Sequence, residues 1–144
     1  MTAVIAAVAA LAGSAIGAGA TYLVAEQQIH NQDQQDAATK TETAYRLALH
    51  WEADLINQLQ TLALAPPGER AIRRPGLVNT LQRSDDVSIE LLLHGSPAAN
   101  DEFDSLFKSL SAISPDDYEA QHRAVMTENV KFANLIAREL RVNG

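Results

Sequence analysis

The chain of 144 residues contains no cysteine, and only 5% of its residues are aromatic. The absence of cysteine excludes disulfides, thiolate nucleophiles and thiolate-bound metals together. Basic side chains are also scarce, because eleven Lys and Arg stand against eighteen Asp and Glu, a formal net charge of −7. Nucleic-acid-binding proteins need a basic face to neutralise phosphates, and membrane-surface proteins often carry a polybasic cluster, so the balance argues against both classes.

Charge of either sign is absent from the first 25 residues, since the first acid is Glu26 and the first base is Lys40. A helix over residues 2–25 is about 36 Å long, enough to cross a hydrocarbon core of about 30 Å. We therefore predict a transmembrane helix over 1–25, with membrane lipid as its surroundings. A polar linker or helix extension over 26–42 and a helical domain over 43–144 follow it.

Two alternatives to an anchor stay open for this segment. The small residues at 18–20 resemble an export-signal cleavage site, which would leave a soluble or secreted helical binding domain. However, no basic residue precedes the apolar run, and residues 21–25 extend the run past that site. A buried soluble helix is the other alternative, but the remaining chain is small for enclosing a helix of this length.

Small residues repeat along one face of the predicted span. Gly13 and Gly17 follow the G-x-x-x-G spacing, and Ala6 and Ala9 continue the same stripe. Such stripes let two helices approach closely in lipid, although a segment rich in alanine and glycine also produces them by chance. We interpret the stripe as a surface for self-association or for a membrane-protein partner. All Lys and Arg lie after the span, which favours a cytoplasmic C-terminal domain on a single-pass protein of the cell membrane.

The remainder of the chain follows helical periodicity. Apolar residues at three- and four-residue steps predict a long helix from Thr43 that the residues 66–68, Pro-Pro-Gly, bring to an end. Its predicted buried stripe comprises Ala44, Leu47, Ala48, Trp51, Leu55, Leu59 and Leu62. Residues 68–76 predict a loop or short helical turn, and a short helix is expected to follow from Leu77.

Residues 84–95 fit two structures. Val87, Ile89, Leu91 and Leu93 alternate as they would in a strand, but Leu92 breaks the alternation. Ser84 and the acids that follow it favour a helix start, and Gly95 favours a stop. Because no second strand-like segment exists to pair with it, we predict a helix.

Two Ser-Pro pairs, at 96–97 and 114–115, predict the starts of the last two helices, the second of which runs to about Val142. Their predicted buried residues are Phe103, Leu106, Phe107, Leu110 and Ile113 in the first and Tyr118, His122, Val125, Phe132, Ile136 and Leu140 in the second. The predicted fold class is all-α: one N-terminal transmembrane helix and a bundle of four to five helices.

The sequence contains no catalytic or cofactor motif, and we predict a non-enzymatic protein without cofactor or metal. His50 and Asp54 lie four residues apart and would face one ion from one helix, but no partner motif accompanies them. His94 suits the end of a helix, and His122 lies on an apolar face. The paired acids at 85–86, 101–102 and 116–117 fall near predicted helix starts, where the helix dipole favours them.

One basic cluster stands out in this acidic chain. It comprises Arg70, Arg73, Arg74 and Arg83. The cluster is a candidate for contact with anionic lipid or with an acidic partner. The alternative is a solvated segment that pairs with acids of its own domain.

The overall plan resembles a group of uncharacterised actinobacterial membrane proteins. The similarity lies in residues 3–18, in Gly95-Ser96-Pro97 and in the segment from Phe132 through Arg138-Glu139-Leu140. It implies an N-terminal span followed by a helical domain, and it implies no activity. Our leading hypothesis is a membrane-anchored scaffold, accessory subunit or regulator that acts through helix–helix contacts. A small pore-forming or lysis-related membrane protein is the alternative from another class.

Overall fold

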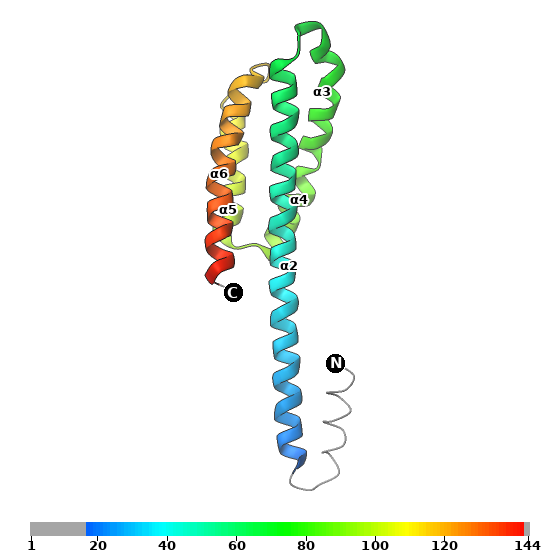
Figure 1. The fold of residues 1–144 in the computed structure, drawn as a ribbon, viewed down its shortest axis with the longest axis vertical. Coiled ribbons are helices and arrows are strands. Elements are labelled where there is room, and N and C mark those ends of the chain that lie inside the picture. The colour runs from blue at the N-terminus through cyan, green and yellow to red at the C-terminus, as the bar shows by residue number, and fades with distance from the viewer. Residues whose placement is uncertain (1–16, 143–144) are drawn as a thin grey trace. The chain divides into compact units, whose positions relative to one another are not determined.

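The structure, a computed structural model, describes residues 17–142 (Figure 1). It contains the helices α2 (Gly17–Leu64), α3 (Pro67–Gln82), α4 (Ser84–His94), α5 (Pro97–Ser111) and α6 (Tyr118–Val142). No strand occurs between residues 17 and 142, so the all-helical prediction is confirmed, including the helix over 84–94.

The chain divides into two compact units, residues 1–39 and 40–144. In the first unit the structure describes residues 17–39, all of which belong to α2, including most of the predicted linker. None of the described helices is both long and apolar enough to cross a membrane. Most of the predicted transmembrane helix, residues 1–16, lies outside the described residues, so the anchor stays a prediction.

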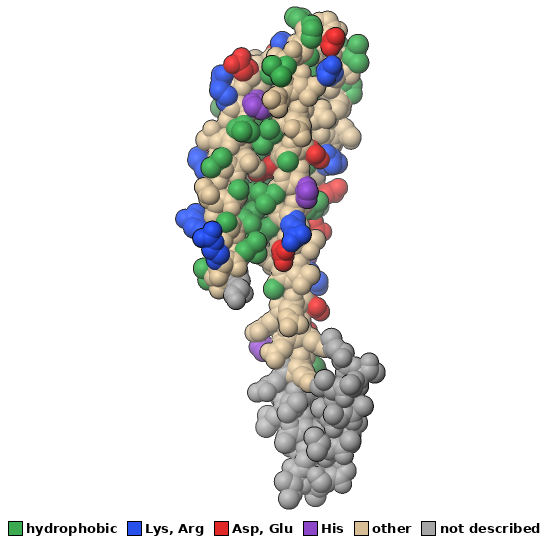
Figure 2. All heavy atoms as spheres, in the orientation of Figure 1, with side chains coloured by type: hydrophobic (Ala, Val, Ile, Leu, Met, Phe, Trp, Pro, Cys, Tyr) green, Lys and Arg blue, Asp and Glu red, His purple; other side chains and the backbone are tan. Residues whose placement is uncertain are grey.

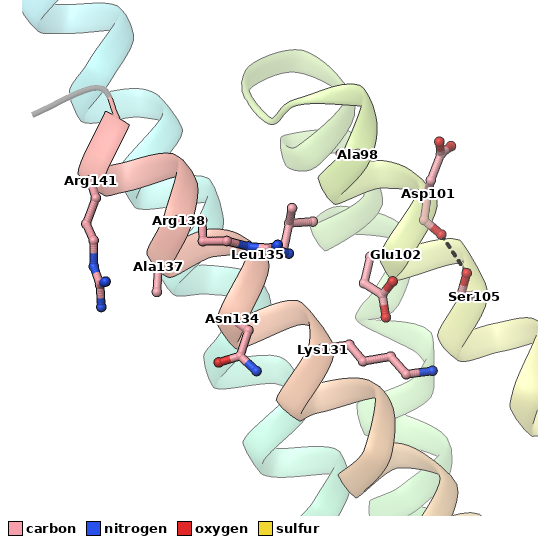
Figure 3. A pocket seen from close by; sticks show the side chains of 10 residues that line it. All are labelled: Ala98, Asp101, Glu102, Ser105, Lys131, Asn134, Leu135, Ala137, Arg138 and Arg141. Carbon is pink, nitrogen blue, oxygen red and sulfur yellow. Dashed lines mark hydrogen bonds between the residues drawn. The ribbon is translucent and has the colours of Figure 1, made fainter.

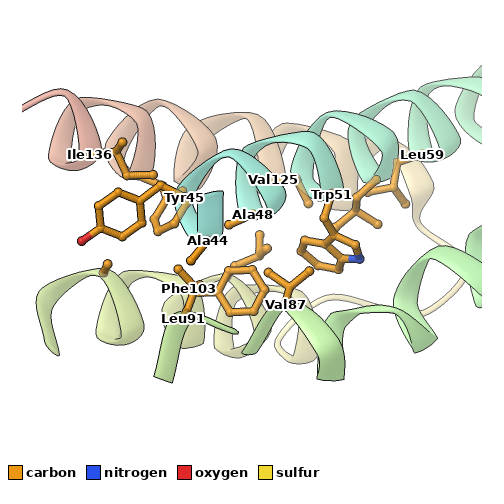
Figure 4. Packing of buried hydrophobic residues seen from close by; sticks show 14 of the residues in the cluster. Ala44, Tyr45, Ala48, Trp51, Leu59, Val87, Leu91, Phe103, Val125 and Ile136 are labelled. Atoms are coloured by element: carbon orange, nitrogen blue, oxygen red, sulfur yellow. The ribbon is translucent and has the colours of Figure 1, made fainter. Parts of the chain in front are cut away.

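In the second unit, α5 and α6 lie beside α2 and run antiparallel to each other (Figure 1). Helices α3 and α4 follow one another along the other side of α2. The core lies between these helices (Figure 4). The part of α2 beyond residue 40 contributes its predicted stripe with one exception: Leu47 is 41% exposed. Tyr45 is buried instead of Leu47, because Tyr45 lies nearer the centre of the side of α2 that faces the core.

Aromatic rings connect α2 to α5 in the core. The ring of Trp51 lies 5.3 Å from that of Phe103 and 5.7 Å from that of Phe107, measured between centroids. The indole Nε1 of Trp51 donates a hydrogen bond of 2.7 Å to the carbonyl of Thr80 on α3. Trp51 therefore contacts two neighbouring helices at once.

The prediction for residues 68–82 was wrong, because a single helix, α3, spans the expected loop and short helix. Pro67 occupies its first turn, where a proline costs no hydrogen bond. Pro75 lies inside the helix on its exposed side, so the carbonyl that loses its hydrogen bond has access to water. The proline therefore interrupts the bonding but not the helix.

The two Ser-Pro pairs behave differently. Ser96 caps α5 as predicted, since its Oγ accepts a hydrogen bond of 3.0 Å from the amide of Ala99. At the second pair the prediction was wrong: residues 114–117 form a turn in which the amide of Asp117 donates to the carbonyl of Ser114. The carboxylate of Asp117 then accepts from the amide of Ala120, so α6 begins at Tyr118.

The buried faces of α5 and α6 largely follow the predicted stripes. Phe103, Leu106, Tyr118, Val125, Phe132 and Ile136 are buried, and Phe107, Leu110, Ile113 and His122 are partly buried. Leu140 is 39% exposed, contrary to the prediction, because it lies in the last turns of α6 at the edge of the buried arc.

Candidate functional site

Helix α4 exposes three large apolar side chains. Ile89, Leu92 and Leu93 retain 54%, 73% and 66% of their surface in contact with solvent. With about 3.6 residues per turn, the three lie on one side of the helix, opposite the core residues Val87 and Leu91. Single exposed apolar residues are ordinary, but neighbours on one face form a patch of the kind that marks an interaction site. We call this surface the outer face of α4.

The start of the same face is acidic. Asp85 and Asp86 are exposed and lie in the first turn of α4, where the helix dipole favours negative charge. The outer face of α4 therefore changes from acidic at its first turn to apolar over its last two turns.

Gly95 brings α4 to an abrupt end. Its amide donates a hydrogen bond of 2.7 Å to the carbonyl of Leu91, and a Cβ at residue 95 would lie only 2.6 Å from that oxygen. The side-chain amide of Asn100 donates to the same carbonyl at 3.0 Å. This close approach requires glycine and fixes the direction in which the chain enters α5.

A polar network joins α2, the α4–α5 connection and α6. The carboxylate of Glu139 accepts hydrogen bonds from the hydroxyl of Tyr45 and from the hydroxyl of Ser96, the latter at 2.5 Å. The amide of Ser96 in turn donates to the Tyr45 hydroxyl at 3.1 Å. These groups border a hollow of about 490 Å³. Each of them already has partners within the chain, so the network is structural.

Carboxylates from three helices meet inside the bundle. They are Glu52 of α2, 1% exposed, Glu128 of α6, 9% exposed, and Glu102 of α5. The side-chain amide of Asn129 donates a hydrogen bond of 2.6 Å to Glu52 Oε2. Lys131 Nζ lies 3.3 Å from Glu128 Oε1. We call Glu52, Glu102 and Glu128 the carboxylate cluster.

Burial raises the pKa of Glu52 from 4.5 to about 7. The hydrogen bond from Asn129 opposes this shift, because it favours the ionised form, and the nearby charges of Glu102 and Glu128 add to it. A carboxyl group with this pKa changes its charge within the ordinary range of cellular pH.

The carboxyl groups of Glu102 and Glu128 lie close enough to affect each other's pKa, and a hydrogen bond between them requires a proton on one of the two. Burial raises the pKa of Glu102, and its bond to Glu128 raises it further. Burial also acts to raise the pKa of Glu128, but hydrogen bonds from Glu102 and Lys131 leave it lowered. Glu102 Oε1 is buried and has no hydrogen-bond partner among the described residues, which is unusual for a buried polar atom.

Of the carboxylate cluster, Glu102 lines an open groove between α5 and α6, about 820 Å³ in volume (Figure 3). Glu102 and Asp101 line its α5 side, and Lys131, Arg138 and Arg141 line its α6 side. The opposite charges face one another across the groove. The lining therefore carries both signs of charge and does not form a site of one sign.

Sequence reasoning missed the carboxylate cluster, although the signal was present. Glu52 lies four residues after Ala48 and three before Leu55, and Glu128 lies three after Val125 and four before Phe132. Both therefore fall on the buried stripes of their helices. A charged residue on such a stripe is the informative exception.

Three of the four predicted arginines contact their own domain. Arg70 lies over the ring of Tyr118, 5.9 Å from its centroid, while Arg73 pairs with Glu69 and Arg83 pairs with Asp54. Arg74 is exposed. These contacts agree with the alternative of a solvated, self-paired segment, and contact with lipid or an acidic partner stays a prediction.

The remaining candidate residues do not form a site in the described chain. Asp54 pairs with Arg83, and His94 lies 3.9 Å from Glu90 at the end of α4. Between residues 17 and 142 no three His, Asp or Glu side chains are arranged to hold a metal ion. Of the predicted membrane-packing residues, Ala6, Ala9 and Gly13 lie outside the described residues, and only the helical backbone is described at Gly17.

Hydrophobic side chains also gather on the face shown in Figure 2, along the seam between α2 and α6. The exposed apolar residues of α6 include Met126 at 44% and Val130 at 57%. Both are less exposed than Leu92 and Leu93. The outer face of α4 is therefore the stronger candidate for an interaction surface.

Fold and surface together define a small helical bundle with an exposed apolar face. No protein-family model matches the chain, and no curated protein or solved structure matches it. The resemblance to actinobacterial membrane proteins stays a prediction.

Proposed function

We propose that this chain is a non-enzymatic adaptor that its N-terminal apolar segment holds at a membrane and that binds a partner helix through the outer face of α4. The observation that carries the proposal is the exposure of Ile89, Leu92 and Leu93 side by side on one helix.

The energetics of α4 favour a cover over this face. A helix that is apolar on both sides is normally buried on both, yet α4 buries only the side of Val87 and Leu91. Covering the exposed parts of the three outer side chains contributes roughly 3–6 kcal/mol. An amphipathic helix laid along this face would supply that cover with a few anchoring side chains.

The charges of α4 select among partners. Asp85 and Asp86 attract a partner that carries Lys or Arg beside its apolar residues. A second copy of this chain is a poor match: in a parallel pair of α4 helices the acids would face one another. In an antiparallel pair they would face the apolar residues. The expected occupant is therefore an apolar and basic helix of another protein.

Membrane attachment rests on the uncharged run over residues 2–25, followed by all Lys and Arg of the chain. This arrangement supports a single-pass protein of the cell membrane with its helical domain on the cytoplasmic side. The resemblance to actinobacterial membrane proteins agrees with the same plan. Such a protein would bring its partner to the membrane surface.

A binding titration tests the proposal with defined probes. Full-length protein in neutral detergent is titrated against a labelled helical peptide of leucine and lysine, with protein-free micelles as the blank, and anisotropy reports binding. A peptide of leucine and glutamate serves as the matched probe. We expect binding of the lysine peptide, weakened at least about tenfold by Leu92→Ser with Leu93→Ser.

The control variant is Ile72→Ser on α3, because Ile72 is 79% exposed but lies outside the outer face of α4. It should leave binding unchanged, whereas Asp85→Asn with Asp86→Asn should weaken binding at low salt. Equal binding of both peptides, or equal loss in the Ile72 variant, would contradict the proposal. Self-association through α4 would replace it with a homodimer.

A further inference from the structure

The carboxylate cluster is a second feature that the proposed function does not use. It places Glu52 of α2 against the α5–α6 pair, which contributes Glu102 and Glu128. Glu52 is almost completely buried, and its carboxylate accepts a hydrogen bond from Asn129 of α6. The cluster therefore lies at the contact between α2 and the α5–α6 pair, where a change of charge acts on how the helices pack.

The number of charges at this contact does not balance. Three carboxyl groups meet one cation, Lys131, and that cation contacts Glu128. The neutral donors are Asn129 toward Glu52 and Ser109, whose hydroxyl lies 3.5 Å from Glu128. With all three groups ionised, two negative charges would remain close together, one of them on the almost completely buried Glu52, which is costly in a site of low polarity. The cluster consequently retains protons.

We propose that the carboxylate cluster is a proton-dependent latch. With protons on Glu52 and between Glu102 and Glu128, α5 and α6 stay packed on α2, and loss of these protons loosens the contact.

The sign of the pH dependence follows from the groups in the cluster. The pKa of Glu52 is raised from 4.5 to about 7, so between these values the folded chain holds a proton that the unfolded chain has released. The resulting stabilisation is complete below about pH 4.5 and is lost as pH rises through about 7. The raised pKa of Glu102 acts in the same direction. The lowered pKa of Glu128 makes stability rise with pH, but only below about pH 4.5, outside the range in which Glu52 titrates.

Trp51 is a built-in reporter of the latch. It is the only tryptophan of the chain, it neighbours Glu52 on α2, and its ring packs against Phe103 and Phe107 of α5. Separation of α5 from α2 would admit water to the indole. The emission of Trp51 should therefore shift to longer wavelength when the latch opens.

The test records Trp51 emission and the melting temperature of the full-length protein in neutral detergent between pH 5.5 and 8.5. We expect a reversible red shift centred near neutral pH and a melting temperature that falls over the same range. Glu52→Gln keeps the shape and the bond to Asn129 but cannot ionise, so it should remove most of both changes. Glu119→Gln is the control, since its exposed carboxylate pairs only with Arg123.

A carbon-13 NMR titration of glutamate carboxyls in the wild-type chain reads the protons directly and does not depend on a variant that folds. One carboxyl should titrate near pH 7. The proposal is overturned if no glutamate titrates above pH 6. It is also overturned if Glu52→Gln shows the same emission shift and melting profile as the wild type. Because this test uses no peptide, it can fail while binding at α4 holds.

Discussion

At the scale of single residues, the chain depends on close approach and on buried charge. Gly95 is required because the Leu91 carbonyl occupies the space that a Cβ would need, and not because of an unusual backbone angle: its φ is −87°. The carboxylate of Glu139 on α6 accepts hydrogen bonds from Tyr45 of α2 and from Ser96 of the α4–α5 connection, and so links these three parts of the chain. These residues fix how α4 and α5 meet.

Replacing Gly95 tests this close approach. Gly95→Ala places a Cβ 2.6 Å from a backbone oxygen, so the end of α4 must shift, at a cost of about 1–3 kcal/mol. Gly68→Ala is the matched control, because nothing lies within 4 Å of its added Cβ. Because Gly68 lies in the first turn of α3, this substitution should leave stability unchanged or raise it by up to about 1 kcal/mol. Urea unfolding of both variants measures the difference, and equal midpoints would contradict the packing at Gly95.

What the sequence revealed at this scale depends on the range of the interaction. The cap at Ser96 was predictable, because it involves an amide three residues away. The cluster of Glu52, Glu102 and Glu128 was not, because residues from three helices form it. The helical period is consistent with Glu52 and Glu128 lying on buried stripes, which the sequence analysis overlooked, and periodicity alone cannot show that the two stripes meet.

At the scale of elements, α4 shows why one segment resisted assignment from sequence. Its alternating apolar residues arise because one side of the helix faces the core and the other side, with Ile89 and Leu93, faces out. An apolar pattern on two faces weakens the helical period and resembles a strand. The property that made the sequence ambiguous is the one that makes α4 a candidate surface.

Helix α3 provides a stability prediction at the same scale. Pro75 lies inside the helix and removes one backbone hydrogen bond. Pro75→Ala restores that bond, and even after the greater freedom of the unfolded chain is subtracted it should stabilise the protein by about 1–2 kcal/mol. Sequence reasoning assigned residues 68–76 to a loop or short helical turn because proline and glycine close it, and it could not foresee that one helix would run through Pro75.

Pro97→Ala is the matched control, because Pro97 occupies the first position of α5 and costs no hydrogen bond there. Its melting temperature should stay the same or fall slightly. A Pro75→Ala variant that melts at or below the temperature of the wild type would show that α3 does not run through residue 75.

At the scale of the whole molecule, the chain combines an uncharged N-terminal segment with a helical bundle in which α4 exposes an apolar face. The helical class was predictable because local periodicity determines it, as were the ends of α2 and α4. The exposed face was not, because exposure depends on which helices pack together. We propose that these two parts hold a partner helix at a membrane.

Site-specific photo-crosslinking in cells tests this claim most directly. A photoreactive residue replaces Leu93 in the outer face of α4, or Ile72 on α3 as the control, and adducts are analysed in washed membranes. We expect the protein in the membrane fraction and an adduct at position 93 alone, joined to a segment of another protein rich in apolar and basic residues. Equal adducts at both positions, an adduct only with a second copy, or protein that stays in the supernatant would contradict it.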